Sequence, residues 1–225
     1  MKLLASGKSL IVGTCAVALT GMSASAATIA SWGTAGSTTS LAANFEGAGV
    51  SADNLEAGEG LDVRNDSAFN FDDWDTASVS SADALAANDF WTWGFESSSA
   101  YDLTDFSIRL DRSGAGPDDF LIELAINGSG SFVSVLSHDF QDSANGVNFL
   151  NVDLSGFDSV TDADFRLTAF NSESAAGTFD LELLPSSSNG IIITGEVSAV
   201  PLPAPALMLL AGLFGLGALR FRRSA

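Results

Sequence analysis

Cysteine, histidine and lysine are nearly absent from this chain of 225 residues. Its one cysteine, Cys15, lies in an apolar N-terminal segment, and no lysine follows Lys8. Beyond that segment the chain cannot form disulfides, and it lacks the clustered cysteines and histidines of zinc sites. The one histidine, His138, has no G-x-S-x-G elbow to work with, so a serine-hydrolase triad has little support.

Basic side chains are scarce as well, since nine lysines and arginines stand against 28 acidic residues, for a formal net charge of −19. All 28 acidic residues fall within residues 27–198, where only four arginines occur, so this segment carries a net charge of −24. Such a surface repels nucleic acid and anionic lipid. It keeps the protein soluble through self-repulsion, which salt or divalent cations would relieve.

The N-terminus has the three parts of a secretory signal peptide. Lys2 and Lys8 supply the positive region, and residues 10–19 form the apolar core. We expect the Sec export machinery to recognise this segment and cleavage to follow Ala26, at a small-residue site formed by Ala24, Ala26 and Ala27. Residues 1–26 are therefore predicted to be removed.

The C-terminus also has three parts in a fixed order. A proline-spaced motif comes first, made of Val200, Pro201, Leu202, Pro203 and Ala204. An apolar run over residues 206–219 follows, which predicts a transmembrane helix once the flanking apolar residues are added. Arg220, Arg222 and Arg223 close the chain and are expected to stay on the cytoplasmic side.

This tail resembles the C-terminal sorting signal of the PEP-CTERM type, in the variant named VPLPA-CTERM after the residues that stand here at 200–204. The resemblance implies recognition by an exosortase of a Gram-negative bacterium, after transient anchoring in the inner membrane. The final location would be the cell surface or the extracellular matrix. The alternative is an ordinary tail anchor, which would keep the protein in the membrane permanently.

Between the two signals, residues 27–198 are long enough for one domain with a sizeable core. Apolar residues alternate with polar ones over 106–110, 120–126, 150–154, 165–167 and 179–183. Period two indicates strands with one buried face, and Gly- and Asn-rich turns separate them. The pattern predicts an all-β domain, an antiparallel β-sandwich of jelly-roll or lectin-like form. The sorting signal occupies 199–225.

The body of the chain resembles the β-sandwiches that PEP-CTERM proteins commonly carry. The resemblance is carried by YDLTDFSIRLDRSGAGPDDFLIEL at 101–124, VDLSGFDSVTDADFRLTAF at 152–170 and GTFDLELL from Gly177. It implies a lectin-like or galactose-binding-like sandwich and brings no catalytic residues with it. We therefore expect a protein that is not an enzyme. A secreted sandwich-fold hydrolase is the alternative, and it would require two carboxylates paired in a cleft.

Two groups of residues are candidates for ligand binding. Two clusters of acidic residues could hold calcium, although aspartates are also common turn residues: Asp72, Asp73 and Asp75 crowd around Trp74, and Asp118 and Asp119 follow the glycine loop that starts at Gly114. Trp74, Trp91 and Trp93 could stack on sugar rings if they are exposed, or fill the core if they are not. Trp91 and Trp93 are two apart and share one face of any strand there.

Together these patterns predict an exported, non-enzymatic protein of the cell surface or exopolysaccharide matrix. Glycan binding is its candidate activity, and exopolysaccharide its candidate partner. No cofactor is expected other than calcium.

Overall fold

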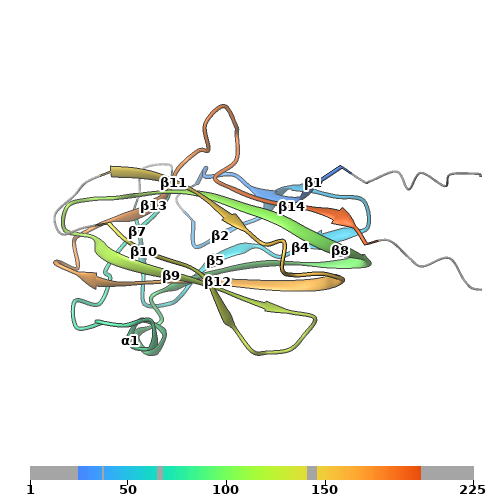
Figure 1. Cartoon of the computed structure of the whole chain (residues 1–225). Coiled ribbons are helices and arrows are strands. Elements are labelled where there is room, and N and C mark those ends of the chain that lie inside the picture. The colour runs from blue at the N-terminus through green and yellow to red at the C-terminus, as the bar shows by residue number, and fades with distance from the viewer. Residues whose placement is uncertain (1–24, 37, 65–67, 141–145, 199–225) are drawn as a thin grey trace, which may run out of the picture.

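The computed structural model describes residues 25–36, 38–64, 68–140 and 146–198. They form two facing layers of antiparallel strands with one short helix (Figure 1). The antiparallel β-sandwich predicted from the alternating pattern is therefore confirmed. The predicted sorting signal and most of the predicted signal peptide lie outside the described residues. Within the described part of the chain, no helix is long and apolar enough to cross a membrane.

One long strand, β8 (Phe90–Arg112), belongs to both layers. Its first half pairs with β12 (Val160–Ser172), and its second half pairs with β11 (Gly146–Asp153) and β14 (Ile191–Val197). The pairing with β12 slips between Glu96 and Tyr101, where the intervening serines are partly or fully exposed. The strand passes from one layer to the other over this stretch, as Figure 1 shows.

The first layer is built around the first half of β8 and β12. On the β12 side it continues with β9 (Pro117–Ile126) and β10 (Val133–Asp139). On the other side of β8 lie β4 (Val50–Ala52) and β5 (Leu55–Ala57), and β5 pairs in turn with β2 (Ser40–Leu41).

The second layer is built around the second half of β8. Next to β14 lie β1 (Ala27–Trp32) and then β3 (Ala43–Glu46). β13 (Phe179–Leu181) pairs with the same edge of β8, beyond β14. β7 (Phe69–Asp72) pairs with β13, and β6 (Asp62–Val63) pairs with β7. The first strand of the domain, β1, thus pairs with the last, β14, and Ala27 lies opposite Gly195.

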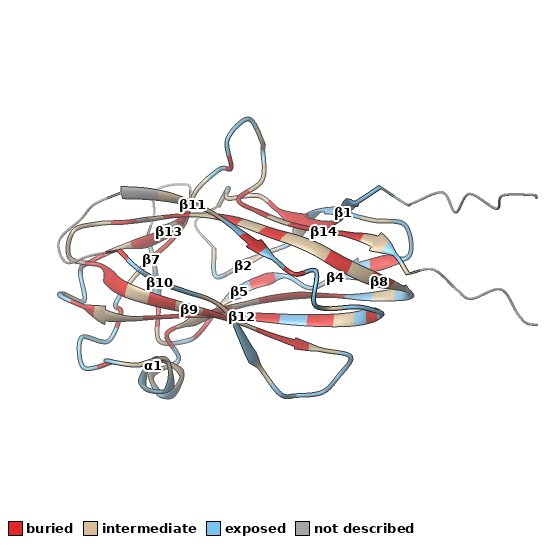
Figure 2. Ribbon diagram, in the orientation of Figure 1, coloured by how far each residue is buried: buried red, intermediate tan, exposed pale blue. Residues whose placement is uncertain are grey.

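The core lies between the layers and is mainly aromatic, and buried residues alternate with exposed ones along the strands (Figure 2). Trp93 and Phe165 of the first layer stack with Phe106 of the second, with ring centroids 5.2 to 5.7 Å apart. Trp91 packs against Phe179 of the second layer at 5.3 Å. Burying such rings is the main source of stability for a sandwich without disulfides.

Local signals set the helix and one hairpin. Helix α1 (Ser81–Ala87) begins after Ser80, whose hydroxyl accepts a hydrogen bond from the Asp83 N–H, and it ends at Asn88 in the left-handed conformation. The turn from β9 to β10 contains Asn127 and Gly128 with φ of 53° and 62°. Asn and Gly are the residues that tolerate positive φ at both central positions of such a hairpin.

Candidate functional site

The structure decides between the two roles predicted for the tryptophans. Trp74, Trp91 and Trp93 are 1%, 0% and 2% exposed and lie in the core. They fill the space between the layers rather than forming an exposed platform for sugar rings. For Trp91 and Trp93 the cause is the pleat of β8, which turns its bulky apolar face inward because that face buries the most surface.

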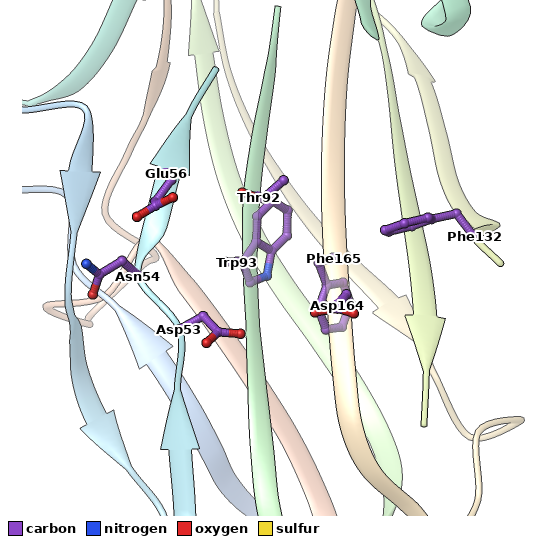
Figure 3. Close-up of a pocket in the computed structure, with 8 residues that line it drawn as sticks. All are labelled: Asp53, Asn54, Glu56, Thr92, Trp93, Phe132, Asp164 and Phe165. Atoms are coloured by element: carbon purple, nitrogen blue, oxygen red, sulfur yellow. The ribbon is translucent and has the colours of Figure 1, made fainter. Parts of the chain in front are cut away.

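The same pleat turns Thr92 and Gly94 to the outer face of the first layer, and a pocket lies on that face. The pocket has a volume of about 390 Å³. Five polar residues and three aromatic residues line it (Figure 3): Asp53, Asn54, Glu56, Thr92, Asp164, Trp93, Phe132 and Phe165. The polar residues come from three neighbouring segments, namely the β4–β5 region, β8 and β12.

Two carboxylates converge above Gly94. Asp164 lies directly opposite Gly94 in the pairing of β12 with β8, and the Asp53 N–H donates to the Gly94 carbonyl on the other edge of β8. A Cβ placed on Gly94 would lie 2.9 Å from Asp53 Oδ2 and 3.3 Å from Asp164 Oδ1. The two oxygens are therefore within roughly 6 Å of each other. The same Cβ would lie 2.6 Å from the Ala163 backbone carbonyl oxygen, so the close approach of β12 is what requires glycine here.

The backbone at Asp53 is fixed from two sides. Its N–H donates to Gly94 at 2.9 Å, and its carbonyl accepts from the buried Trp32 indole, also at 2.9 Å. Asn54 is held by a hydrogen bond that its side-chain amide donates to the Ser40 hydroxyl. Glu56 lies opposite Thr92 in the pairing of β5 with β8. Asp53 and Asn54 thus lie in the connection between β4 and β5, which these hydrogen bonds hold in place, and the other polar residues of the pocket lie on paired strands.

The electrostatics of the pocket follow from this crowding of carboxylates. Partial burial raises the pKa of Asp53, and the negative charges of Glu96, Asp162 and Glu56 raise it further. Partial burial raises the pKa of Asp164 too, followed by repulsion from Asp162, Asp53 and Glu96. A positive charge or hydrogen-bond donors placed in the pocket would stabilise the ionised form of both carboxylates.

An aromatic side chain lies on the far side of β12. Phe132, which directly precedes β10, lines the pocket, and the guanidinium of Arg166 lies 4.1 Å from the centre of its ring. The same guanidinium donates to Glu123 at 2.8 Å. The charge of Arg166 is thus already engaged by a carboxylate and a ring.

Of the five aspartates predicted to bind calcium, Asp72 ends β7 and Asp118 and Asp119 lie in β9, and four of the five side chains are engaged in other contacts. Asp72 pairs with Arg64, Asp118 pairs with the buried Arg112, and Asp119 accepts from the Asn171 amide. Asp75 accepts from the Ala77 N–H, and Asp73 adopts a positive φ of 64°. The structure does not gather these five residues around one point. Calcium binding stays a prediction, and it is contradicted if added calcium fails to raise the melting temperature of chelator-treated protein.

A tighter group of carboxylates lies elsewhere, on β8, on β13 and directly after β13. Carboxylate oxygens of Asp111, Asp180 and Glu182 are all within 4.8 Å of one another. Asp111 lies opposite Asp180 in the pairing of these strands. Sequence reasoning missed this group because its members are far apart in the chain and meet only through the register of the sheet.

The predicted processing sites fall at the edge of the described residues. Val200, Pro201, Leu202, Pro203, Ala204, Arg220, Arg222 and Arg223 lie outside them, as does Ala24. Ala26 is exposed, and Ala27 begins β1. Cleavage after Ala26 would leave the whole of β1 in the mature protein.

Sequence reasoning also missed Asp53 and Asp164, and one signal could have pointed to their pocket. If Trp91 and Trp93 are core residues, then Thr92 and Gly94 must face outward, and a glycine there marks a place where other groups approach closely. The partners themselves could not be found this way, because they depend on which segments pair with β8.

Comparison with known proteins adds no family. No protein-family model matches the chain, and no curated protein matches it. Among solved structures, a family 29 carbohydrate-binding module from Piromyces equi is similar, with 10% identity over 77% of this chain and 91% of that chain and a TM-score of 0.37. An F5/8 type C domain from Bacteroides fragilis is similar with 11% identity, a TM-score of 0.32, and coverage of 75% of this chain and 99% of that one. At these TM-scores neither shared ancestry nor a shared ligand follows.

Proposed function

We propose that this protein is exported, is not an enzyme, and binds a glycan of the cell surface or exopolysaccharide matrix through the pocket over Gly94. The observation that carries the proposal is the convergence of fixed polar groups in one open pocket on a rigid sheet. Ligand sites are typically concave and combine apolar walls with a few well-placed polar groups.

The lining groups suit a sugar ring. The carboxylates of Asp53, Glu56 and Asp164 accept hydrogen bonds from hydroxyls, and the Asn54 amide and Thr92 hydroxyl can both donate and accept. Charged acceptors form the stronger class of hydrogen bond. Phe132 offers an apolar surface on the far side of β12 against which the ring of a sugar could rest.

The export and sorting part of the proposal is supported by the two terminal signals of the sequence. The predicted VPLPA-CTERM tail would be processed by an exosortase-type enzyme. The arrangement of the domain is compatible with this role, because β1 and β14 are paired and the two ends of the domain lie side by side. Both processing events would then take place at one end of a folded sandwich.

Glycan binding is tested with the full-length protein in detergent solution, by its retention on a panel of insoluble polysaccharides. We expect at least one polysaccharide to retain the wild type and to release the Asn54→Ala and Phe132→Ala variants. Phe149→Ala is the matched control, because this ring is 52% exposed on β11 of the other layer. If no polysaccharide retains the wild type, or the pocket variants bind as well as the control, the glycan proposal fails.

Sorting is tested by peptide mapping of the protein from separated membrane, surface and medium fractions of its host. We expect a form that begins at Ala27 and lacks the residues beyond 200–204, recovered from the surface or the medium. An intact C-terminal peptide containing Arg220, found only in the membrane, would instead establish a permanent tail anchor facing the periplasm.

A hydrolase is the second candidate, because two carboxylates within roughly 6 Å are the arrangement that glycoside hydrolysis by an acid and a nucleophile requires. Catalysis needs one of the two carboxyl groups to be protonated and the other ionised. Burial and shared repulsion raise the pKa of both Asp53 and Asp164, and these directions assign neither of the two as the acid. Release of reducing ends from a retained polysaccharide, abolished by Asp164→Asn, would establish the hydrolase.

A further inference from the structure

We propose that the pocket over Gly94 selects amino-sugar glycans, whose free amines carry positive charge, over neutral and acidic ones. This inference rests on the proposed function and names the class of glycan. It is drawn from the balance of charge around the pocket.

The outward-facing residues of the first layer form rows across the strands. One row runs from Asp53 across Gly94 to Asp164, and the next brings Glu96 opposite Asp162. Glu56 lies at the edge of the pocket on β5. Five carboxylates thus come from three adjacent segments, and no positively charged residue stands in either row.

The arginines of the described residues do not compensate these charges. Arg166, the one nearest the pocket, lies in the row that joins Thr92 to Glu123, where it pairs with that glutamate and contacts Phe132. Arg64 pairs with Asp72 and Arg109 donates to the Leu183 carbonyl, both in the other layer, and Arg112 pairs with Asp118 in the core. The negative charge of the pocket is therefore left for a ligand to neutralise.

A protonated amine fits this site better than a hydroxyl. The charge repulsion and partial burial that act on Asp53 and Asp164 both favour a cation between them, because it offsets the repulsion and satisfies several oxygens at once. A uronic acid or a sulfated sugar would add a negative charge and be repelled, and this repulsion contributes to specificity. The net charge of the chain adds to this rejection and also attracts any amine, so the contribution of the pocket has to be measured apart from that of the whole surface.

The experiment compares two oligosaccharides that differ only in charge. Glucosamine oligomers and the N-acetylated oligomers of equal length and linkage are titrated into the full-length protein in detergent, at pH 6, low salt and with a chelator present. We expect the glucosamine oligomer to bind at least 10-fold more tightly, and the ratio to shrink in 0.5 M salt because screening weakens exposed charge pairs. A galacturonic acid oligomer is expected not to bind.

Variants separate the pocket from the general charge of the protein. Asp53→Asn with Asp164→Asn should bring the two affinities within about 3-fold, while the same number of charges removed at exposed sites outside the pocket, Asp158→Asn with Glu173→Gln, should leave the 10-fold ratio intact. A ratio that persists in the pocket variant overturns the inference, since the whole surface would then attract the amine.

The remaining outcomes distinguish the two proposals. Equal binding of both oligomers, lost in Asn54→Ala, overturns the selection of amino sugars and leaves the glycan proposal standing. Tighter binding of the galacturonic acid oligomer overturns the selection as well. No binding of any oligomer, together with no retention on any polysaccharide, overturns both.

Discussion

The buried ion pair between Arg112 and Asp118 offers the sharpest test of how this sandwich is held together. The Arg112 side chain is 0% exposed and that of Asp118 only 11%. The guanidinium also donates to the carbonyls of Ser113 and Gly114, each at 3.0 Å, and so ties the turn before β9 to the end of β8. Asp118→Ala would remove the carboxylate that pairs with this charge and leave the guanidinium buried in the core.

The expected cost follows from these contacts. Removing one partner of a buried pair typically costs 3–5 kcal/mol. Because two carbonyl contacts remain and Asp118 is near the surface, we expect the lower end, about 3 kcal/mol. For a domain of this size that corresponds to a fall in Tm of about 6–12 °C. Asp118→Asn keeps an acceptor of the same shape and should lose roughly half as much.

The measurement is urea unfolding of the full-length protein, followed by tryptophan fluorescence. Asp158→Ala removes an exposed carboxylate and should change the free energy of unfolding by less than about 0.5 kcal/mol. A double-mutant cycle with Arg112→Met isolates the interaction between the two side chains. A coupling energy below about 0.5 kcal/mol would refute the reasoning, because the pair would then add nothing beyond its separate members.

Three further predictions concern the core, the pocket and a turn. Trp91→Ala should destabilise the protein by about 3–5 kcal/mol in the same assay, whereas Phe149→Ala should have little effect; equal losses would contradict the burial of Trp91. Asp53→Asn should stabilise the protein by roughly 0.5 kcal/mol at pH 7, since it removes a charge that partial burial and repulsion disfavour, an effect that solvent screening keeps small. Because the folded-state pKa of Asp53 is raised, the folded protein binds the proton more readily, so this gain should vanish as the pH falls to the ordinary value of 3.8; a gain that grows in acid would reverse the sign of the argument. Gly128→Ala should cost about 1 kcal/mol, because alanine disfavours a φ of 62° although nothing lies within 4 Å; an unchanged Tm would show that the turn relaxes.

The class of fold could be predicted because its signal is local. Alternation along 106–110 and 120–126 marks strands with one buried face, and the Asn127–Gly128 pair marks a hairpin, whatever the rest of the chain does. The double membership of β8 could not be predicted in this way. The serines around Ser98 have the composition of a loop, and they stay extended because β4 pairs with Ser97, the Ser98 N–H donates to the Gly49 carbonyl, and β12 and β14 pair with the strand beyond them.

The candidate site could not be predicted from local sequence patterns either, because its residues are far apart in the chain. Asp53 and Asp164 are separated by most of the domain, and they meet because both segments pair with β8 at Gly94. A shift of either register by one residue would turn its carboxylate away from the other. The tryptophans could be assigned to one face from their spacing, but only the packing of the second layer decides that this face is the inner one.

The pairing of β1 with β14 also sets the order in which an exported chain can fold. In the proposed export β1 would leave the membrane first, yet the strand that joins it to β8 is the last of the domain, so both β1 and β8 would keep an open edge until nearly all of the domain had crossed. Open edges are prone to pair with other chains, and closing contacts between the ends of a chain is slow. The sandwich is completed only when residue 197 is outside, three residues before the proline-spaced motif begins. Arrival of the sorting motif at the outer side of the membrane would therefore coincide with completion of the fold, so that a sorting enzyme would meet a finished domain.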